Sequence, residues 1–426
     1  MRFLNMLLIS LFVNLIIAQE NFHDTIWEFN RHEIAVGDHL YALMGATALL
    51  GEEGAIIKDA TIIIKGNRIM EIGSSGSVDI PAGAEKLDLS GKFILPGMLD
   101  AHFHEGKVKD LLPKFLAQGV TSLRDPGAWN ESYLGWRKLG APIQRLFLTG
   151  PHLDQYPPAY PLNSMLVRDA REAEFAVNDF IDEGATAIKV YFRLPLGTIE
   201  TICQTAHSRG VPVTAHLEIT KAKDAIKVGL DGIEHITSFG TSLIHPRDAE
   251  KYKQLILADN NARRKGRYEV WKSVDLQDTF YLNPLLKLLR ENGTFVSPNL
   301  AVFEKQPDQG DSIEVEGFAR MLEFTGMIDR AGGNIVVGSH TFVPYAELGL
   351  GYAHEMELLV QAGMTTGKVI EAATIQNARF FRVEERLGSL AKGKLADLVV
   401  LSSDPLENIS NIRQVEKVML NGVWVK

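Results

Sequence analysis

Short apolar segments alternate with longer stretches of helical pattern from residue 93 to residue 381, and this alternation constrains the fold more than any other feature of the sequence. Buried strands that alternate with helices are typical of parallel βα units. Eight such units over about 290 residues fit a (β/α)8 barrel of the TIM type, which is an α/β fold. We therefore expect this barrel over residues 93–384. The expected strands are residues 93–104, 121–125, 146–150, 187–192, 211–217, 232–237, 294–300 and 334–340.

The two ends of the chain differ from this middle region. Residues 39–88 and 396–425 contain short apolar runs that are separated by Gly and Asn turn signals. Such runs are typical of antiparallel strands. Two strand-rich ends around a different middle predict one small composite β-sandwich domain, made from residues 20–92 and 385–426.

Residues 1–19 predict a signal peptide. Arg2 precedes an apolar run at residues 7–18, and the chain becomes polar at Gln19. A run of about a dozen residues is short for a spanning helix, which needs about twenty, so we favour cleavage over a membrane anchor. The mature protein is then expected to be periplasmic or secreted, with no membrane attachment. Cys203 is the only cysteine, so this protein needs no disulfide within the chain.

The charge balance excludes one class of partner. Lys and Arg total 44 against 53 Asp and Glu, which gives a formal net charge of -9 at pH 7. Nucleic acids and anionic membranes attract basic surfaces, so neither is an expected partner. The hydrophobic content of 46% and charged content of 23% match globular proteins and exclude a disordered or fibrous chain.

Four histidines and one lysine end the expected strands. His102 and His104 are two residues apart in an extended segment and therefore point to one side. Lys189, His216 and His235 end three later strands. Strand ends of a barrel meet at one rim, so these side chains should bind one or two divalent ions, with zinc the first candidate. The spacing of His102 and His104 at a strand end itself favours metal ligands over a hydrogen-bonded pair. His216 and His235 would each alone more often be hydrogen-bonded core residues, and their common placement favours a metal site.

Lys189 is the unusual member of this set. An ammonium group has no lone pair and repels a cation, so an unmodified lysine is a poor ligand. Reaction with carbon dioxide would give a carboxylated lysine, an anion whose two oxygens can bridge two metal ions. An ordinary lysine at a strand end is the alternative interpretation.

Three further features have two interpretations each. Dense charge over residues 248–272 predicts a solvated helix, with a lid over the barrel mouth as the alternative. His152 could face the substrate or make no functional contact. Tyr191 and Arg193 follow Lys189, and whichever faces the barrel mouth could hold a substrate carboxylate, although packing explains Arg193 equally well.

Several of these segments resemble the metal-dependent amidohydrolase superfamily, in particular its imidazolonepropionase-like and prolidase-like members. The segments that carry the resemblance are residues 95–104, 188–190, 213–216, 233–235 and 387–399. Their combination is specific, although each motif alone is weak. The resemblance implies that His102 and His104 hold one metal and that carboxylated Lys189 bridges it to a second. His216 and His235 would hold that second metal.

The end of the eighth expected strand departs from the family. The family has Gly-Thr-Asp there, and its aspartate contacts a metal and moves a proton, whereas this chain has Gly-Ser-His at residues 338–340. A histidine can carry a proton near neutral pH and can also bind metal, so His340 is the candidate catalytic residue. Asp125, Glu347 or Glu355 could supply the missing carboxylate. The loss of a negative charge should weaken metal retention.

These features predict an exported metal-dependent hydrolase. By the resemblance, it would cleave a C–N bond of a small-molecule substrate (an amide, a cyclic amide or a dipeptide) with a metal-activated water, and His340 would carry the proton to the departing nitrogen. The altered eighth strand leaves two alternatives. One is a non-catalytic binding protein on the same barrel, and the other is a metal-dependent isomerase or lyase. The sequence is compatible with an oligomer.

Overall fold

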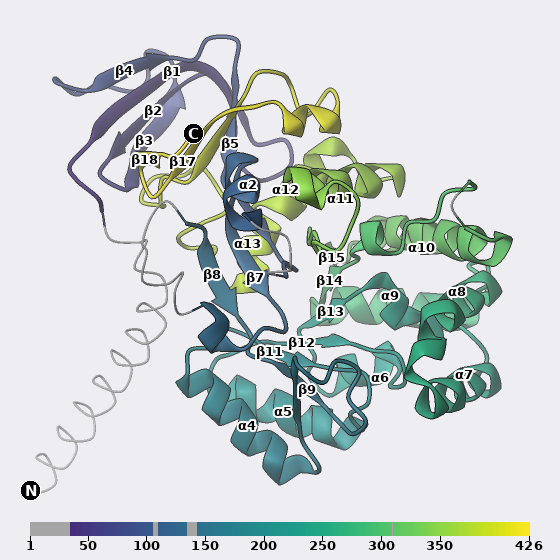
Figure 1. Cartoon of the computed structure of the whole chain (residues 1–426). Helices are drawn as coiled ribbons and strands as arrows, with labels where there is room; N and C mark the ends of the chain where they lie inside the picture. The colour runs from purple at the N-terminus through teal and green to yellow at the C-terminus, as the bar shows by residue number, and fades with distance from the viewer. Residues whose placement is uncertain (1–34, 105–109, 134–142, 309) are drawn as a thin grey trace, which may run out of the picture.

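The computed structural model describes residues 35–104, 110–133, 143–308 and 310–426 (Figure 1). The predicted signal peptide, residues 1–19, lies outside these ranges and stays a prediction. Among the described residues, no helix combines the length and the apolar character that a membrane crossing requires.

Parallel strands form the predicted α/β barrel. Three pair in the order β6-β7-β8, and the others pair in the order β10-β9-β11-β12-β13-β14-β15. Each of the eight predicted segments overlaps one of these strands. The strands are β6 (Met98–Asp100), β7 (Val120–Asp125), β8 (Arg145–Leu148), β9 (His152–Asp154), β10 (Ser164–Leu166), β11 (Ile188–Val190), β12 (Val213–His216), β13 (Gly232–Glu234), β14 (Phe295–Ser297) and β15 (Asn334–Ile335).

Backbone hydrogen bonds outside the named strands close the ring. The Ala101 N–H donates to the Val337 carbonyl at 3.0 Å, which joins the segment after β6 to the segment after β15. The Thr186 N–H donates to the Leu148 carbonyl at 2.8 Å, which joins β8 to the segment before β11. The third barrel strand is divided, since β8 pairs with β7 whereas β9 pairs with β11. The strands therefore surround one core, as the TIM-type prediction requires.

Amphipathic helices cover the outside of the barrel (Figure 1). In α4, for example, the Asp169 side chain accepts the Glu172 N–H as an N-cap, while Val177 and Phe180 are buried against the strands. The helices are α2 (Leu111–Ala117), α4 (Ala170–Asp182), α5 (Leu196–Ser208), α6 (Ala222–Lys227), α7 (Pro246–Ala258), α8 (Arg263–Ser273), α9 (Thr279–Asn292), α10 (Ser312–Arg330), α11 (Gly351–Gln361), α12 (Thr366–Ala373) and α13 (Ile375–Phe381).

Strands from both ends of the chain form one eight-stranded sheet. Its order is β18-β17-β16-β5-β1-β2-β3, with β4 paired to β1. The strands are β1 (Leu40–Leu49), β2 (Ile56–Lys65), β3 (Arg68–Ser74), β4 (Glu85–Asp88), β5 (Phe93–Pro96), β16 (Leu398–Leu401), β17 (Val415–Leu420) and β18 (Val423–Trp424). A buried ion pair between Arg145 and Asp397 ties this sheet to the barrel. The strand pairing thus shows that both ends of the chain contribute strands to one sheet. The arrangement of these strands as a β-sandwich stays a prediction.

The segment 93–104, predicted as one barrel strand, is two strands. Its first part, β5, pairs with β1 and β16 in the composite sheet, and only β6 belongs to the barrel. The chain changes sheets at Gly97, whose N–H donates to the Asp397 carbonyl at 2.8 Å. A Cβ atom at Gly97 would lie 2.3 Å from Thr121 Oγ1, so this crossing needs glycine. The apolar pattern continues through the crossing, because both strands are buried, and therefore hides the break.

Candidate metal centre

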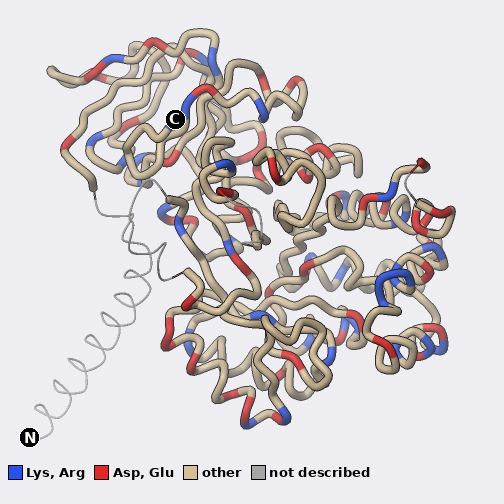
Figure 2. Tube along the Cα trace, in the orientation of Figure 1, with Lys and Arg blue, Asp and Glu red and all other residues tan. Residues whose placement is uncertain are grey.

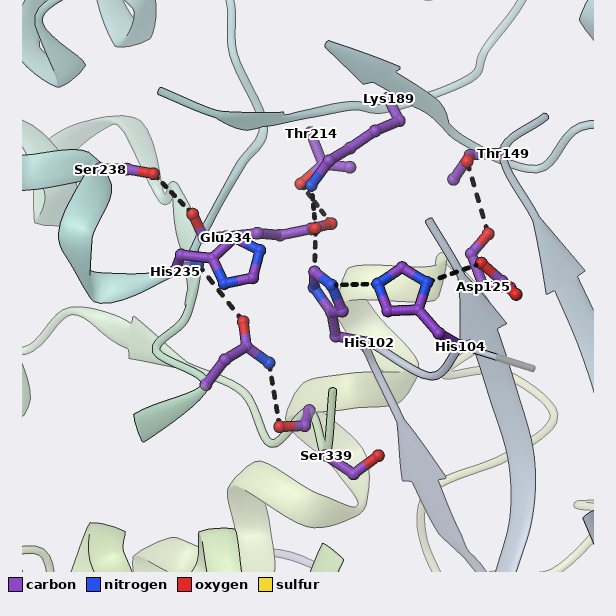
Figure 3. A network of polar contacts seen from close by, with 12 residues as sticks. His102, His104, Asp125, Thr149, Lys189, Thr214, Glu234, His235, Ser238 and Ser339 are labelled. Atoms are coloured by element: carbon purple, nitrogen blue, oxygen red, sulfur yellow. Dashed lines mark hydrogen bonds and ion pairs between the residues drawn. The ribbon is translucent and has the colours of Figure 1, made fainter. Parts of the chain in front are cut away.

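His102 and His104 follow β6 at the rim where the carboxyl ends of the barrel strands meet. Asp100 Oδ1 accepts the His102 N–H at 3.0 Å and the Ser339 N–H at 2.9 Å, so one buried carboxylate fixes the turn before both histidines. The Nε2 atoms of His102 and His104 are 3.0 Å apart (Figure 3). Two imidazole nitrogens at this distance can share one proton or one cation.

His235 and His340 complete a cluster with His102. One ring nitrogen of each lies within 4.8 Å of the others. His235 and His340 have positive φ angles of 64° and 63°, a strained conformation for residues other than glycine that is often found at functional sites. Backbone bonds hold both, because the His235 N–H donates to the Ser297 carbonyl at 2.8 Å and the His340 N–H donates to the His102 carbonyl at 2.6 Å.

Lys189 reaches the same cluster as part of a buried ion pair with Glu234 (Figure 3). Thr214 Oγ1 donates to Glu234 Oε1 at 2.9 Å, and His102 Nδ1 lies 2.8 Å from Glu234 Oε2. Burial acts to raise the pKa of Glu234, but Lys189 and His102 hold that pKa well below its usual range. Glu234 is therefore an anion that neutralises the lysine in this structure. Carboxylation of Lys189 stays a prediction.

Sequence reasoning missed Glu234 as a site residue. In an extended strand, neighbouring side chains point to opposite faces, so Glu234 and His235 are not expected on one side. The positive φ of His235 ends the strand and breaks this alternation. Both side chains then face the cluster. The only signal in the sequence was the carboxylate placed directly before a candidate ligand.

His216, at the end of β12, is oriented by a second buried carboxylate. His216 Nε2 lies 3.0 Å from Glu218 Oε1, and the Tyr252 hydroxyl donates to Glu218 Oε2. Burial acts to raise the pKa of Glu218, but Arg267, His216 and Arg263 lower it to about 2. An ionised Glu218 favours the tautomer with the proton on Nε2, which leaves the His216 Nδ1 lone pair free.

The donor chemistry of these histidines fits a divalent metal. Burial lowers the pKa of His102 and of His216 to about 4, and it lowers the pKa of His235 and His340 well below the usual value. These rings are therefore neutral at pH 7, the form that binds metal. The buried Nδ1 atoms of His216, His235 and His340 have no hydrogen-bond partner among the described residues. Metal coordination would satisfy such nitrogens.

Of the three carboxylates considered as substitutes at the eighth strand, one reaches the site. Asp125 Oδ1 lies 3.2 Å from His104 Nδ1, and Asp125 Oδ2 accepts the Tyr133 hydroxyl at 2.7 Å. Glu347 is exposed on the 3-10 helix η6 (Ala346–Leu348). Glu355 is buried, but its oxygens accept the backbone N–H groups of residues 300 and 301 at 2.8 Å. The suggestions of Glu347 and Glu355 were therefore wrong.

All six sequence-predicted site residues line one cavity of about 780 Å³. These residues are His102, His104, Lys189, His216, His235 and His340. Arg263, Arg264, Arg267 and Tyr268 of α8 line the same cavity. The prediction of a purely solvated helix over residues 248–272 was therefore wrong for the inner face of α8. Charged residues of both signs lie on α7 and α8 (Figure 2). The density of charge in the sequence therefore did not show which face of the helix is exposed.

The structure separates the three aromatic and basic candidates near Lys189. His152 and Tyr191 both line the cavity, with their rings stacked at a centroid distance of 4.5 Å. Arg193 does not line the cavity, and its guanidinium donates to the Ile256 carbonyl at 3.1 Å. The suggestion that Arg193 could hold a substrate carboxylate was wrong, because the side chain anchors α7 instead.

Known proteins match this chain in both sequence and structure. A model of the amidohydrolase family matches residues 321–425. The imidazolonepropionase of Paenarthrobacter aurescens (strain TC1) is 44% identical to this chain over 52 residues, and that of Arthrobacter sp. (strain FB24) is 40% identical over 52 residues. Each match covers 12% of this chain and 12% of the curated relative.

The fold matches solved structures over almost the whole chain. A prolidase-type protein from Bifidobacterium longum has a TM-score of 0.69 and 25% identity, over 91% of this chain and 94% of that chain. A Xaa-Pro dipeptidase has a TM-score of 0.68 and 21% identity, over 91% of this chain and 100% of that chain. The A. niger ochratoxinase shares the fold. It has a TM-score of 0.69 and 19% identity, over 92% of this chain and 96% of that chain. The family model over residues 321–425, the imidazolonepropionase matches and the Bifidobacterium longum structure together support the similarity of this chain to the amidohydrolase superfamily.

Proposed function

We propose that this protein is a metal-dependent hydrolase that cleaves a C–N bond of a small molecule. One observation carries the proposal: buried, neutral histidines from the carboxyl ends of several strands line one cavity, and some of their ring nitrogens have no hydrogen-bond partner among the described residues. The relatives named imidazolonepropionase, prolidase and Xaa-Pro dipeptidase support C–N bonds as the target. Amides, cyclic amides and dipeptides are the substrates to test.

The ligands would come from the five residues that the sequence singled out. His102 and His104 would share one ion, His216 and His235 would hold a second, and Lys189 would bridge them as a carbamate. Burial lowers the pKa of Lys189, which favours the neutral amine that reacts with carbon dioxide. A bound divalent metal, zinc first, would acidify a water and polarise a carbonyl.

Glu234 opposes carboxylation of Lys189 unless a cation lies between the two groups. The present ion pair joins an ammonium to a carboxylate, whereas a carbamate would place two anions side by side. Carboxylation and metal binding should therefore occur together. The mass of the intact protein, measured with and without metal under added bicarbonate, tests this coupling.

His340 would supply the proton that hydrolysis must deliver to the departing nitrogen. Burial keeps its ring neutral, so it can accept a proton and return it. Its Nδ1 has no hydrogen-bond partner among the residues described. The 4.8 Å cluster with His102 and His235 also suits His340 as a metal ligand, and this is the second candidate role.

The first experiment combines metal content with turnover. Elemental analysis of the purified protein should find one or two divalent ions per chain, and a panel of amides, cyclic amides and dipeptides should contain a substrate whose cleavage stops in His102→Ala. Absence of metal after reconstitution would contradict the proposal. Binding without product would favour the binding-protein alternative, and a product without oxygen-18 from labelled water would favour an isomerase or lyase.

Export of the protein is a separate proposal. It rests on the sequence of residues 1–19 alone. Fractionation of the native host and N-terminal sequencing of the mature protein should show a chain that begins near residue 20 outside the cytoplasm. A cytoplasmic protein that retains Arg2 would contradict export and leave the hydrolase proposal unchanged.

A further inference from the structure

One buried side chain connects the segments that carry His235 and His340. Asn299 lies just after β14, the strand between β13 and β15 in the sheet. Its Oδ1 accepts the His235 N–H at 3.3 Å, and its Nδ2 donates to the Gly338 carbonyl at 3.0 Å. The His235 N–H also donates to the Ser297 carbonyl, so Asn299 is the second acceptor of a shared hydrogen. A single amide group therefore bridges the two strand ends on either side of it.

The bridge needs one donor and one acceptor on a short side chain. The His235 N–H is a donor and the Gly338 carbonyl is an acceptor, so the amide of Asn299 satisfies both in only one orientation. Asn299 also has a left-handed backbone, with φ 51° and ψ 49°. Asparagine adopts this conformation more readily than most residues other than glycine. The side chain and the backbone therefore both favour asparagine at this position.

Both segments that the bridge connects contain strained backbone. His235 and His340 have φ angles of 64° and 63°, and the β-branched Thr341 has a φ of 58°. Such conformations persist only where the surrounding structure holds them. A Cβ atom at Gly338 would lie 2.9 Å from Asn299 Nδ2, so the close approach of this segment to the bridge needs glycine. The bridge is therefore one of the contacts that hold the strained segments together.

The backbone around Asn299 is itself fixed. Glu355 accepts the N–H groups of residues 300 and 301 at 2.8 Å each, and the Pro298 carbonyl accepts the Ile236 N–H at 2.9 Å. Asn299 is 0% exposed and does not line the cavity. It can therefore act on the site only through the residues that it connects.

We propose that Asn299 is a positioning residue that fixes the placement of His340 relative to His235. The inference deepens the proposed function and rests on it, because that function makes His235 a metal ligand and His340 the proton carrier. The centroids of the two rings are 5.2 Å apart. A displacement of about 1 Å can lower a rate by about 100-fold, so a bridge between the two segments should affect turnover more than substrate binding.

Asn299→Asp removes half of the bridge with little change of size. The new carboxylate still accepts the His235 N–H, but it has no donor for the Gly338 carbonyl. With the substrate found in the amide panel, we expect kcat to fall about tenfold and KM to stay within about twofold, because Asn299 does not line the cavity. Zinc affinity, measured by competition with a chromogenic chelator, should not fall, because the contact with His235 remains and the added charge is negative.

Asn299→Gly removes both halves of the bridge and keeps a residue that adopts a left-handed backbone. Here kcat should fall at least as far as in Asn299→Asp, and zinc affinity should fall about threefold because the contact with His235 is also lost. Parental kcat and zinc affinity in this variant would overturn the proposal, even if Asn299→Asp fails to fold.

Asn334→Asp is the matched control. Asn334 Nδ2 donates to the Gly293 carbonyl at 3.0 Å, and its Oδ1 accepts Gln376 Nε2 at 3.1 Å. This amide also connects the segments of β14 and β15, but at their amino ends, away from the histidines. Its replacement should leave kcat and zinc affinity at the parental values. An equal fall of kcat in Asn334→Asp and Asn299→Asp would show a purely structural role and overturn the proposal.

A double-mutant cycle tests whether the bridge acts through His340. In the His340→Ala background, Asn299→Asp should lower kcat by less than about twofold, because the group that it positions is already absent. A full tenfold loss in that background would mean that Asn299 acts through another residue, and the proposed link to His340 would then be wrong.

Hydrogen exchange tests the bridge without metal or turnover. In the metal-free protein, Asn299→Asp should speed amide exchange by at least about threefold in peptides that cover residues 338–342, whereas Asn334→Asp should not. Parental exchange in Asn299→Asp would overturn the inference and leave the hydrolase proposal unchanged. Faster exchange in a protein that neither binds zinc nor turns over any substrate would refute the proposed hydrolase while supporting the bridge.

Discussion

The two walls of the cavity handle charge in opposite ways. On the histidine wall, formed by the six predicted site residues, Lys189 pairs with Glu234, and burial keeps the rings of His102 and His235 neutral. On the wall formed by Arg263, Arg264, Arg267 and Lys305, named the basic roof here, four positive charges meet two carboxylates, those of Glu218 and Glu314. The histidine wall therefore suits a cation that is held by neutral nitrogens, and the roof suits an anion.

The largest expected loss of stability comes from removing one partner of the ion pair between Lys189 and Glu234 on the histidine wall. Glu234→Gln leaves the Lys189 ammonium buried without its carboxylate, which should lower the free energy of unfolding of the metal-free protein by about 4 kcal/mol. Urea unfolding at pH 7 measures this loss. Adding Lys189→Met should recover most of it, because the unpaired charge is removed. No recovery would show that Glu234 acts through other contacts.

A slightly smaller effect should come from the carboxylate that joins the two walls. Glu218 has its pKa lowered to about 2 against about 4.3 in an unfolded chain, so its charge stabilises the fold by about 3 kcal/mol at pH 7. This stabilisation is complete above pH of about 4.3 and is lost as pH falls toward 2. Glu218→Gln should therefore be less stable than the parent by about 3 kcal/mol at pH 7 and by less than about 1 kcal/mol at pH 2.5.

The control for this variant is Glu314→Gln. Its carboxylate pairs with Lys305 at 3.6 Å in a partly exposed position, so the change in unfolding free energy should stay within about 0.5 kcal/mol. Metal affinity gives an independent readout, because only Glu218 orients His216, and its loss should weaken metal binding about tenfold or more. Equal effects of both variants would contradict the joining role of Glu218.

The histidine wall was predictable from the sequence and the roof was not. A parallel barrel brings strand ends to one rim, so the positions of His102, Lys189 and His216 on separate strands were enough to place them together. Glu234 was not predicted, because the positive φ of His235, the next residue, breaks the alternation of side chains along the strand. The roof depends on how α8 packs over the cavity, and the charge density of that segment carries no information about its inner face.

The next effect concerns the proton on the histidine wall. His340→Ala should lower kcat/KM by about 100-fold, equivalent to about 2.7 kcal/mol, with the metal content unchanged, because five other residues can hold the metal. His340→Asp should restore part of the activity, because a carboxylate at this position can also accept and return a proton. Loss of metal in His340→Ala would assign this residue to the ligands instead.

The smallest expected loss of stability comes from removing the Tyr252 hydroxyl, which donates to Glu218. Tyr252→Phe removes the donor to Glu218 Oε2, and we expect the free energy of unfolding to fall by about 1.5 kcal/mol. Tyr268→Phe is its counterpart on α8, where the hydroxyl donates to the Phe303 carbonyl at 3.1 Å and touches no carboxylate. Both variants should lose stability, but only Tyr252→Phe should also weaken metal binding, because Glu218 connects it to His216. Equal metal affinity in the two variants would mean that the contact of Tyr252 with Glu218 does not influence metal binding through His216. The carboxylate of Glu218 would then contribute to stability alone.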